Sequence, residues 1–301
     1  MKAIAVALTV SLLAVPGPAQ EPPSPTPAPE PETTPPPQEP APPKEPPPER
    51  PSLKPKDLWR DVKVEAKRYL ADSWAIVTSP LHWDGTDWQR FGGVVVVVGG
   101  LMLVDDEIDI EFQENRSRFT DRVSDATTDF GGSWSSNLGF ALLGSGYVLR
   151  SWEIRETGRE VLEATFMTHV LSKYVFKPAF GRERPFESDG RTRFHLGSST
   201  YDSFPSGHAT QAFALASVVA ARQKGWIVPA LAYTAAAVVA LDRVNDRVHF
   251  ASDVATGAAL GTAVGRFIVH RHRQAQGNAP TRPVNVGLAP IPDGVALRIV
   301  Y

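Results

Sequence analysis

Six apolar segments with the spacing of α-helices follow one another along the sequence. They lie near Gly93–Val104, Leu138–Arg150, Gly158–Phe176, Ser206–Arg222, Trp226–Leu241 and Asp253–His270. Turn signals such as Gly181 and Lys224-Gly225 separate them. A stretch from Leu58 to Ile76 that alternates charged and apolar residues at helical spacing precedes the series. This pattern predicts an all-α fold.

Two of these segments carry further information about packing. Val94 to Val98 could equally form a buried strand by propensity, but its place in the series favours a helix. The last segment has Gly257, Gly261 and Gly265 on one face. Glycine costs helix stability, and at this spacing it usually permits a close approach between helices. We therefore expect another helix to pack closely on that face.

The N-terminus is typical of an export signal. Met1-Lys2 provides a positive start, Ala3 to Val15 is an apolar run, and Gly17-Pro18-Ala19 provides small residues for cleavage. The run is shorter than the about 20 residues that span a bilayer. An uncleaved membrane anchor is the alternative. Both interpretations predict export to the periplasm or cell envelope.

Residues 20–56 hold more than half of the chain's 28 prolines and almost no large apolar side chains. Such a segment cannot bury a core and favours extended polyproline II geometry, so we predict a disordered linker. The predicted domains are a signal peptide at 1–19, the linker at 20–56, a helical domain at 57–275 with its core at 93–270, and a tail at 276–301. In the tail, Val284–Leu288 and Val295–Tyr301 alternate like strands around a turn, which predicts a small C-terminal β-hairpin.

Composition excludes some classes of protein. The net charge of −2 provides no general attraction for nucleic acid. The absence of cysteine excludes disulfides and thiolate metal sites. Histidines also cluster at His270-Arg271-His272-Arg273, where a helix ends. Cations favour a helix C-terminus, so we interpret this cluster as a cationic helix end and predict no metal site.

Three short motifs carry the candidate chemistry. They are Lys177-x6-Arg184-Pro185, Pro205-Ser206-Gly207-His208 and Arg243-x5-His249-x3-Asp253. Phosphoryl transfer needs neutralised phosphate oxygens, an in-line nucleophile and a proton for the leaving oxygen. Arg184 and Arg243 have planar donors that match phosphate oxygens, and Lys177 adds a point charge. Each cation alone would be interpreted as a surface charge.

The second and third motifs add an anion cradle and two histidines. Ser206 is a candidate helix N-cap, and Gly207 lets a ligand approach a helix start that favours anions. His208 would lie beside a bound anion. Asp253, four residues after His249, can accept the Nδ1–H of His249 and leave Nε2 available as a nucleophile. A structural histidine–aspartate pair at a helix start is the alternative.

The motif series resembles the signature of the type 2 phosphatidic acid phosphatase and vanadium haloperoxidase superfamily. That signature is Lys-x6-Arg-Pro, Pro-Ser-Gly-His and Ser-Arg-x5-His-x3-Asp, and the resemblance covers about Gly93 to His270. It implies a helical bundle with a six-helix core and the site at one end. In one departure, Asp242 stands where the signature has serine. Asp242 could bind Arg243 or another cation and lower the local positive potential.

The resemblance also implies a role for each motif residue. Phosphate would be bound by Lys177, Arg184, Ser206, Gly207 and Arg243. His208 would protonate the leaving group, His249 would form the phosphohistidine, and Asp253 would orient it.

The predicted function is a metal-independent, cofactor-free phosphatase of a phosphomonoester or of a lipid phosphate or diphosphate. A vanadium-dependent haloperoxidase, with vanadate held by the same residues, is one alternative. A non-catalytic binding or scaffold protein of the cell envelope is another. The predicted partner is a phosphorylated small molecule or lipid phosphate, with contact to a membrane surface and none to nucleic acid.

The superfamily includes both six-span membrane enzymes and soluble secreted phosphatases. Most apolar segments here are shorter than a membrane span, which favours an exported soluble or membrane-surface domain. The basic residues at the ends away from the motifs would instead suit a positive-inside pattern.

Overall fold

The computed structural model describes residues 55–128, 133–187, 193–277, 285–291 and 294–300. The chain divides into two compact units, Met1–Pro47 and Pro48–Tyr301. The first unit lies outside the described residues, and so do the predicted signal peptide and nearly all of the predicted linker.

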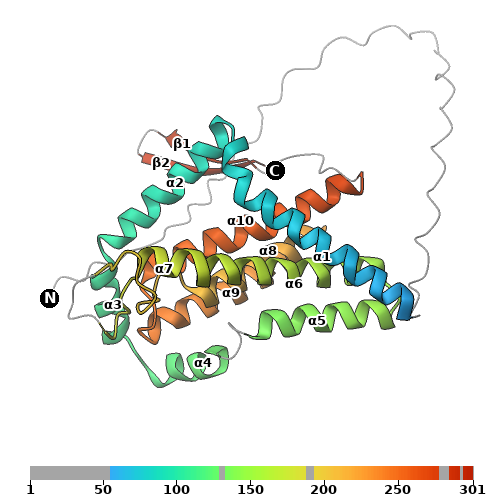
Figure 1. Cartoon of the computed structure of the whole chain (residues 1–301). Helices are drawn as coiled ribbons and strands as arrows, with labels where there is room; N and C mark the ends of the chain where they lie inside the picture. Colours follow the sequence, from blue (N-terminus) through green and yellow to red (C-terminus); the bar gives the residue numbers. More distant parts are fainter. Residues whose placement is uncertain (1–54, 129–132, 188–192, 278–284, 292–293, 301) are drawn as a thin grey trace, which may run out of the picture. The chain divides into compact units, whose positions relative to one another are not determined.

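The second unit is helical, which confirms the predicted fold class (Figure 1). Its helices are α1 (Pro55–Thr78), a 3-10 turn (Ser79–His82), α2 (Gly85–Met102), α3 (Asp105–Glu114), α4 (Arg118–Thr128), α5 (Ser133–Val148), α6 (Trp152–Val170), a π-helical segment (Leu171–Phe176), α7 (Lys177–Phe180), α8 (Gly207–Arg222), α9 (Ile227–Asn245) and α10 (Ala251–Ala275). Each predicted apolar segment falls on one of these helices. Val94 to Val98 is helical, within α2.

The helices α6, α8, α9 and α10 form the centre of the bundle, with α5 packed on α6 (Figure 1). Apolar side chains of α6, α8 and α10 meet in the main core, which consists of Val161, Ala164, Met167, Ala214, Val218, Val264, Ile268 and Val269. A second cluster, Ala209, Ala240, Val244 and Val254, joins α8, α9 and α10 near the three motifs.

The glycine face of α10 packs against α8, as predicted. A Cβ atom added at Gly257 would lie 2.6 Å from the carbonyl oxygen of Ser206, and one at Gly265 would lie 2.7 Å from that of Ala214. Only glycine leaves room for this approach. The contact brings the first turns of the two helices together, and the Ser206 N–H donates to the Asp253 carbonyl oxygen at 3.1 Å.

The helices α3 and α4 were not among the predicted segments. Both are rich in charged and polar residues and contain few apolar ones, so neither stands out in the sequence as an apolar segment. Acidic residues in the first turn of α3 complement the positive end of its dipole. One of them, Asp105, is buried and reaches the motif region.

The basic cluster lies at the C-terminal end of α10, as predicted, but His272 within it is buried. The helix α10 continues to Ala275, and the helical repeat carries His272 onto the same face as Ile268. Its ring is buried and lies 2.8 Å from Asp72 and 3.0 Å from Glu160. Three arginines donate hydrogen bonds to the carboxylates of this cluster, Arg68 to Glu156, Arg222 to Glu160 and Arg271 to Asp72.

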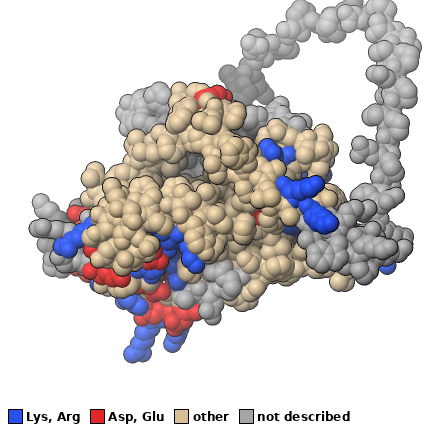
Figure 2. Space-filling view, viewed as in Figure 1, with Lys and Arg blue, Asp and Glu red and all other residues tan. Residues whose placement is uncertain are grey.

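The outer surface of several helices is strongly apolar. The helix α2 has no buried residue among those described, and Val96 and Val97 are 75% and 61% exposed. Figure 2 shows a broad uncharged surface on this face, with the charged side chains gathered on either side of it. Within the described residues, α9 is the one helix whose length and mean hydropathy of 1.6 suit a membrane span.

Two strands follow in the tail. β1 (Asn285–Ile291) pairs antiparallel with β2 (Gly294–Val300), with Leu288 opposite Leu297. The connection between the strands lies outside the described residues, so the predicted hairpin as a whole stays a prediction.

Candidate active site

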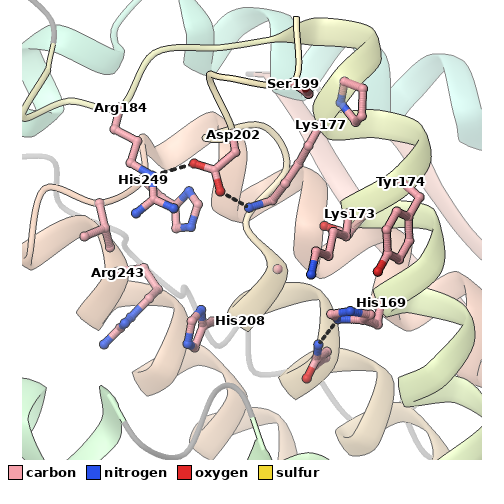
Figure 3. A pocket seen from close by; sticks show the side chains of 15 residues that line it. His169, Lys173, Tyr174, Lys177, Arg184, Ser199, Asp202, His208, Arg243 and His249 are labelled. Carbon is pink, nitrogen blue, oxygen red and sulfur yellow. Dashed lines mark hydrogen bonds and ion pairs between the residues drawn. The ribbon is translucent and has the colours of Figure 1, made fainter.

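Residues of all three motifs line one cavity of about 560 Å³ (Figure 3). They are Lys177, Arg184, Gly207, His208, Arg243 and His249. Segments far apart in the chain therefore meet at the ends of α7, α8, α9 and α10. Ser206 and Asp253 are fully buried next to the cavity and are not among its lining residues.

Lys177 and Arg184 are positioned by the end of the α7 helix. Gly181 ends that helix with a φ of +53°, and a side chain there would collide with the carbonyl oxygen of His195. The turn places both cations against one carboxylate. The Lys177 Nζ lies 3.1 Å from Asp202 Oδ2, and the Arg184 Nε lies 2.9 Å from Asp202 Oδ1.

These contacts keep the Asp202 carboxylate ionised. Burial alone would raise the pKa of Asp202, but Arg184 and Lys177 lower it to about 2. The pKa of Lys177 is lowered, chiefly by burial. Asp202 therefore carries a full negative charge in the cavity at any physiological pH.

Arg243 is buried at the end of α9, and its guanidinium contacts the carboxylate of the preceding residue, Asp242. Its Nε donates to Asp242 Oδ2 at 3.0 Å, and its Nη2 contacts the same oxygen. Asp246 lies 3.5 Å away. Asp242 thus binds Arg243, which is one of the two pairings that its departure from the family signature suggested. The pair reduces the positive potential that Arg243 presents to the cavity.

The N-terminus of α8 forms the floor of the site. Ser206 is its N-cap, as predicted, and the Ser206 Oγ accepts from the Ala209 N–H at 3.4 Å. A Cβ atom at Gly207 would meet only Ser172 Oγ, at 3.8 Å, so the backbone there is open to the cavity. Free backbone N–H groups at a helix start favour a bound anion.

His208 stands in the first turn of α8 beside this backbone. Burial, followed by the charges of Arg243, His249 and Lys177, lowers its pKa to about 4. Without an anion the ring is therefore neutral at physiological pH. A phosphate dianion beside it would oppose those cations and raise the pKa of His208.

His249 is almost fully buried, and its Nδ1 lies 3.8 Å from Asp253 Oδ2. This distance exceeds a hydrogen bond, so the hydrogen bond expected from the i, i+4 spacing is not formed here. Burial and the nearby cations lower the pKa of His249, against the effect of Asp253. Hydrogen bonds between catalytic groups are often long without substrate and shorten when it binds.

The Asp253 carboxylate is held by three other donors. Its Oδ2 accepts from Ser203 Oγ at 2.6 Å and from the Phe250 N–H at 2.8 Å. Its Oδ1 accepts from Arg182 Nη1 at 2.5 Å. Burial alone would raise the pKa of Asp253, but His249, Arg182 and Ser203 lower it. Asp253 is thus a fixed anion behind His249.

Arg182 was missed by the sequence analysis. It is fully buried, it stacks on the Phe250 ring at 4.2 Å, and its Nη2 donates to Asp105 Oδ2 at 2.7 Å. The sequence offers one clue, namely a second arginine inside the first motif, two residues before Arg184. Several other arginines and lysines lie nearby in the sequence, so this clue alone could not separate Arg182 from surface charges.

The rest of the cavity is lined by residues outside the motifs. His169, Lys173 and Tyr174 come from the end of α6 and the π-helical segment, and Gln211 comes from α8. Figure 3 shows His169 and Tyr174 at the end of the cavity away from Arg184. Burial lowers the pKa of His169. Lys173 lies at the same end, beside Tyr174 and His169.

A family model described as the PAP2 superfamily matches residues 160–276. Among solved structures, a transmembrane PAP2 type phosphatidylglycerolphosphate phosphatase from Bacillus subtilis is 20% identical over 63% of this chain and 96% of that chain, with a TM-score of 0.50. LpxE from Aquifex aeolicus is 22% identical over 54% of this chain and 93% of that chain, with a TM-score of 0.41. No curated protein matches the chain.

Proposed function

Because a model of the PAP2 superfamily matches residues 160–276, we propose that the chain is a phosphatase that hydrolyses a lipid phosphate or diphosphate through a phosphohistidine at His249. One observation carries the proposal. Two histidines, three cations and an open helix start, drawn from three motifs, line the same cavity.

In the first step, His249 Nε2 attacks the phosphorus atom. The P–N bond forms and the P–O bond to the leaving group breaks, while His208 gives its proton to the leaving oxygen. Lys177, Arg184 and Arg243 neutralise the charge of the equatorial oxygens. The backbone N–H groups at Gly207 donate hydrogen bonds to them. Asp253 keeps the His249 ring oriented and stabilises its positive charge.

In the second step, water attacks the phosphohistidine. His208 takes a proton from the water, the P–N bond breaks, and phosphate leaves with His249 restored. These residues supply the nucleophile, the acid and the countercharges, so the proposed mechanism uses no metal and no cofactor.

A lipid substrate is supported by the apolar outer surface. The exposed valines of α2 and the exposed Leu231 and Leu241 of α9 are costly in water. Of the soluble and membrane-surface forms that the short apolar segments suggested, these side chains favour the one in contact with a membrane. Carbonate extraction of the membrane fraction distinguishes insertion into the bilayer from contact with its surface, because release of the whole protein into the supernatant would contradict insertion.

The decisive experiment on function is substitution of the nucleophile. His249→Ala should abolish turnover, EDTA should leave the wild type active, and His270→Ala is the matched control because His270 is exposed on α10. Phosphatidate, a polyprenyl diphosphate and an aryl phosphate form the substrate panel. Full activity of His249→Ala would contradict the mechanism. Halide oxidation with added vanadate and little hydrolysis would indicate the haloperoxidase instead.

A further inference from the structure

The cations that would bind phosphate already face carboxylates of this chain. Lys177 and Arg184 share Asp202, and Arg243 is bound to Asp242. The two carboxylates differ in burial, since the Asp242 side chain is 1% exposed and that of Asp202 is 44% exposed. Asp242 is therefore a fixed part of the site, whereas Asp202 can turn into water.

Asp202 binds the two cations as two oxygens of a phosphate would. One oxygen contacts the Lys177 ammonium at 3.1 Å and the other contacts the Arg184 guanidinium at 2.9 Å, as the dashed lines in Figure 3 show. In the described part of the chain, these are the two hydrogen bonds of the Asp202 carboxylate. A phosphate between Lys177 and Arg184 would need the same donors.

We propose that Asp202 is a specificity-determining residue, an internal anion that holds the phosphate position between Lys177 and Arg184 until the substrate displaces it. The inference rests on the phosphatase function proposed above. It follows that an anion with no other contacts, such as free phosphate, binds weakly. A substrate with an apolar chain gains further contacts along the cavity and displaces Asp202 more readily.

The same exchange assists product release. After hydrolysis, free phosphate has lost the contacts of the leaving group, and Asp202 competes with it for Lys177 and Arg184. The residue next to Asp202 keeps the loop in place during this exchange. The Ser203 N–H donates to the Arg182 carbonyl oxygen at 3.0 Å and the Ser203 Oγ donates to Asp253. Only the Asp202 side chain needs to move.

The alternative is that Asp202 stays in place and orients the two cations for phosphate. The two possibilities predict opposite signs for Asp202→Asn. A displaced anion predicts tighter binding of phosphate and vanadate once its charge is removed, by about tenfold, since two charge-assisted contacts no longer compete. An orienting residue predicts weaker binding.

The experiment measures binding of orthovanadate and of inorganic phosphate to the full chain by titration calorimetry. Asp202→Asn and Asp202→Ala should both bind these probes about tenfold more tightly than the wild type. Asp121→Asn is the matched control, because Asp121 forms an exposed pair with Arg116 at 2.6 Å, outside the cavity. Thermal unfolding of each variant verifies that it is folded.

Unchanged or weaker binding in folded Asp202→Asn and Asp202→Ala would overturn the inference while leaving the phosphatase function intact. The proposed function fails separately. If neither the wild type nor the variants bound phosphate or vanadate and His249→Ala retained full activity, the phosphate site itself would be refuted, and the inference with it.

Discussion

Arg182 donates a hydrogen bond to the same carboxylate that faces His249, and its other end is held by Asp105. The three groups form a buried row of alternating charge, Asp105, Arg182 and Asp253. Burying a charge is costly unless a partner compensates it. At the scale of single residues, the site therefore depends on the Asp105–Arg182 pair. This pair lies outside the cavity lining and keeps Asp253 ionised behind the nucleophile.

Arg182→Lys should impair the positioning of Asp253 and His249 while keeping the positive charge. We expect kcat to fall by about a hundredfold, because lysine cannot span Asp105 and Asp253 with a planar fork and a small misplacement of the nucleophile has large effects. A weaker hydrogen bond from residue 182 should also raise the pKa of Asp253. The acidic limb of kcat/KM should then move to higher pH, which a merely structural role would not produce. A pH–rate profile with an unshifted acidic limb would contradict the positioning role.

At the scale of elements, the packing of α10 on α8 aligns two of the three motifs. A Cβ atom at Gly261 would collide with the Thr210 carbonyl oxygen and lie 2.8 Å from the Ala214 nitrogen. Both are backbone atoms of α8 and cannot rotate away. The predicted helices were found because their sequences are rich in apolar residues, which α2 exposes and the central helices pack in the bundle. The helices α3 and α4 have few apolar residues and carried no such signal.

Gly261→Ala should therefore destabilise the fold by about 1–3 kcal/mol, because the added methyl group overpacks the helix contact. Gly99→Ala is the matched control, since Gly99 lies in α2 with nothing within 4 Å of an added Cβ atom. That control should be neutral or stabilise the helix by about 0.5–1 kcal/mol. Chemical denaturation measures both. Equal effects of the two variants would show that the glycine contact does not matter for stability.

At the scale of the whole molecule, the described residues of the helical domain include two large buried charge clusters that lie apart. One surrounds Asp253 beside the cavity, and the other joins α1, α6, α8 and α10 through Arg68, Glu160, Arg222 and His272. In the second cluster, Glu160 is fully buried and both of its oxygens contact Arg222. This cluster lies on the α6 segment Glu156–Glu163, several turns before Lys177, so it ties helices together away from the site.

Arg222→Met should destabilise the domain by about 3 kcal/mol, because it removes the partner that contacts both oxygens of the buried Glu160 carboxylate and leaves it with His272 alone. Arg116→Met, in an exposed pair with Asp121, should change stability by less than about 1 kcal/mol. Urea denaturation compares the two variants. If Arg222→Met were as stable as Arg116→Met, the second cluster would not contribute to stability.

The sequence by itself determined the all-α fold, the close packing on the α10 glycine face and the motif residues that line the cavity, because each has a local pattern: apolar periodicity, glycine spacing or motif order. Only the tertiary structure decided which charges pair. Asp202 on Lys177 and Arg184, Arg182 between Asp105 and Asp253, and His272 among buried carboxylates join residues distant in the chain or on different elements. A charged residue has the same local signature whether it is solvated or buried against a partner, and only packing distinguishes the two.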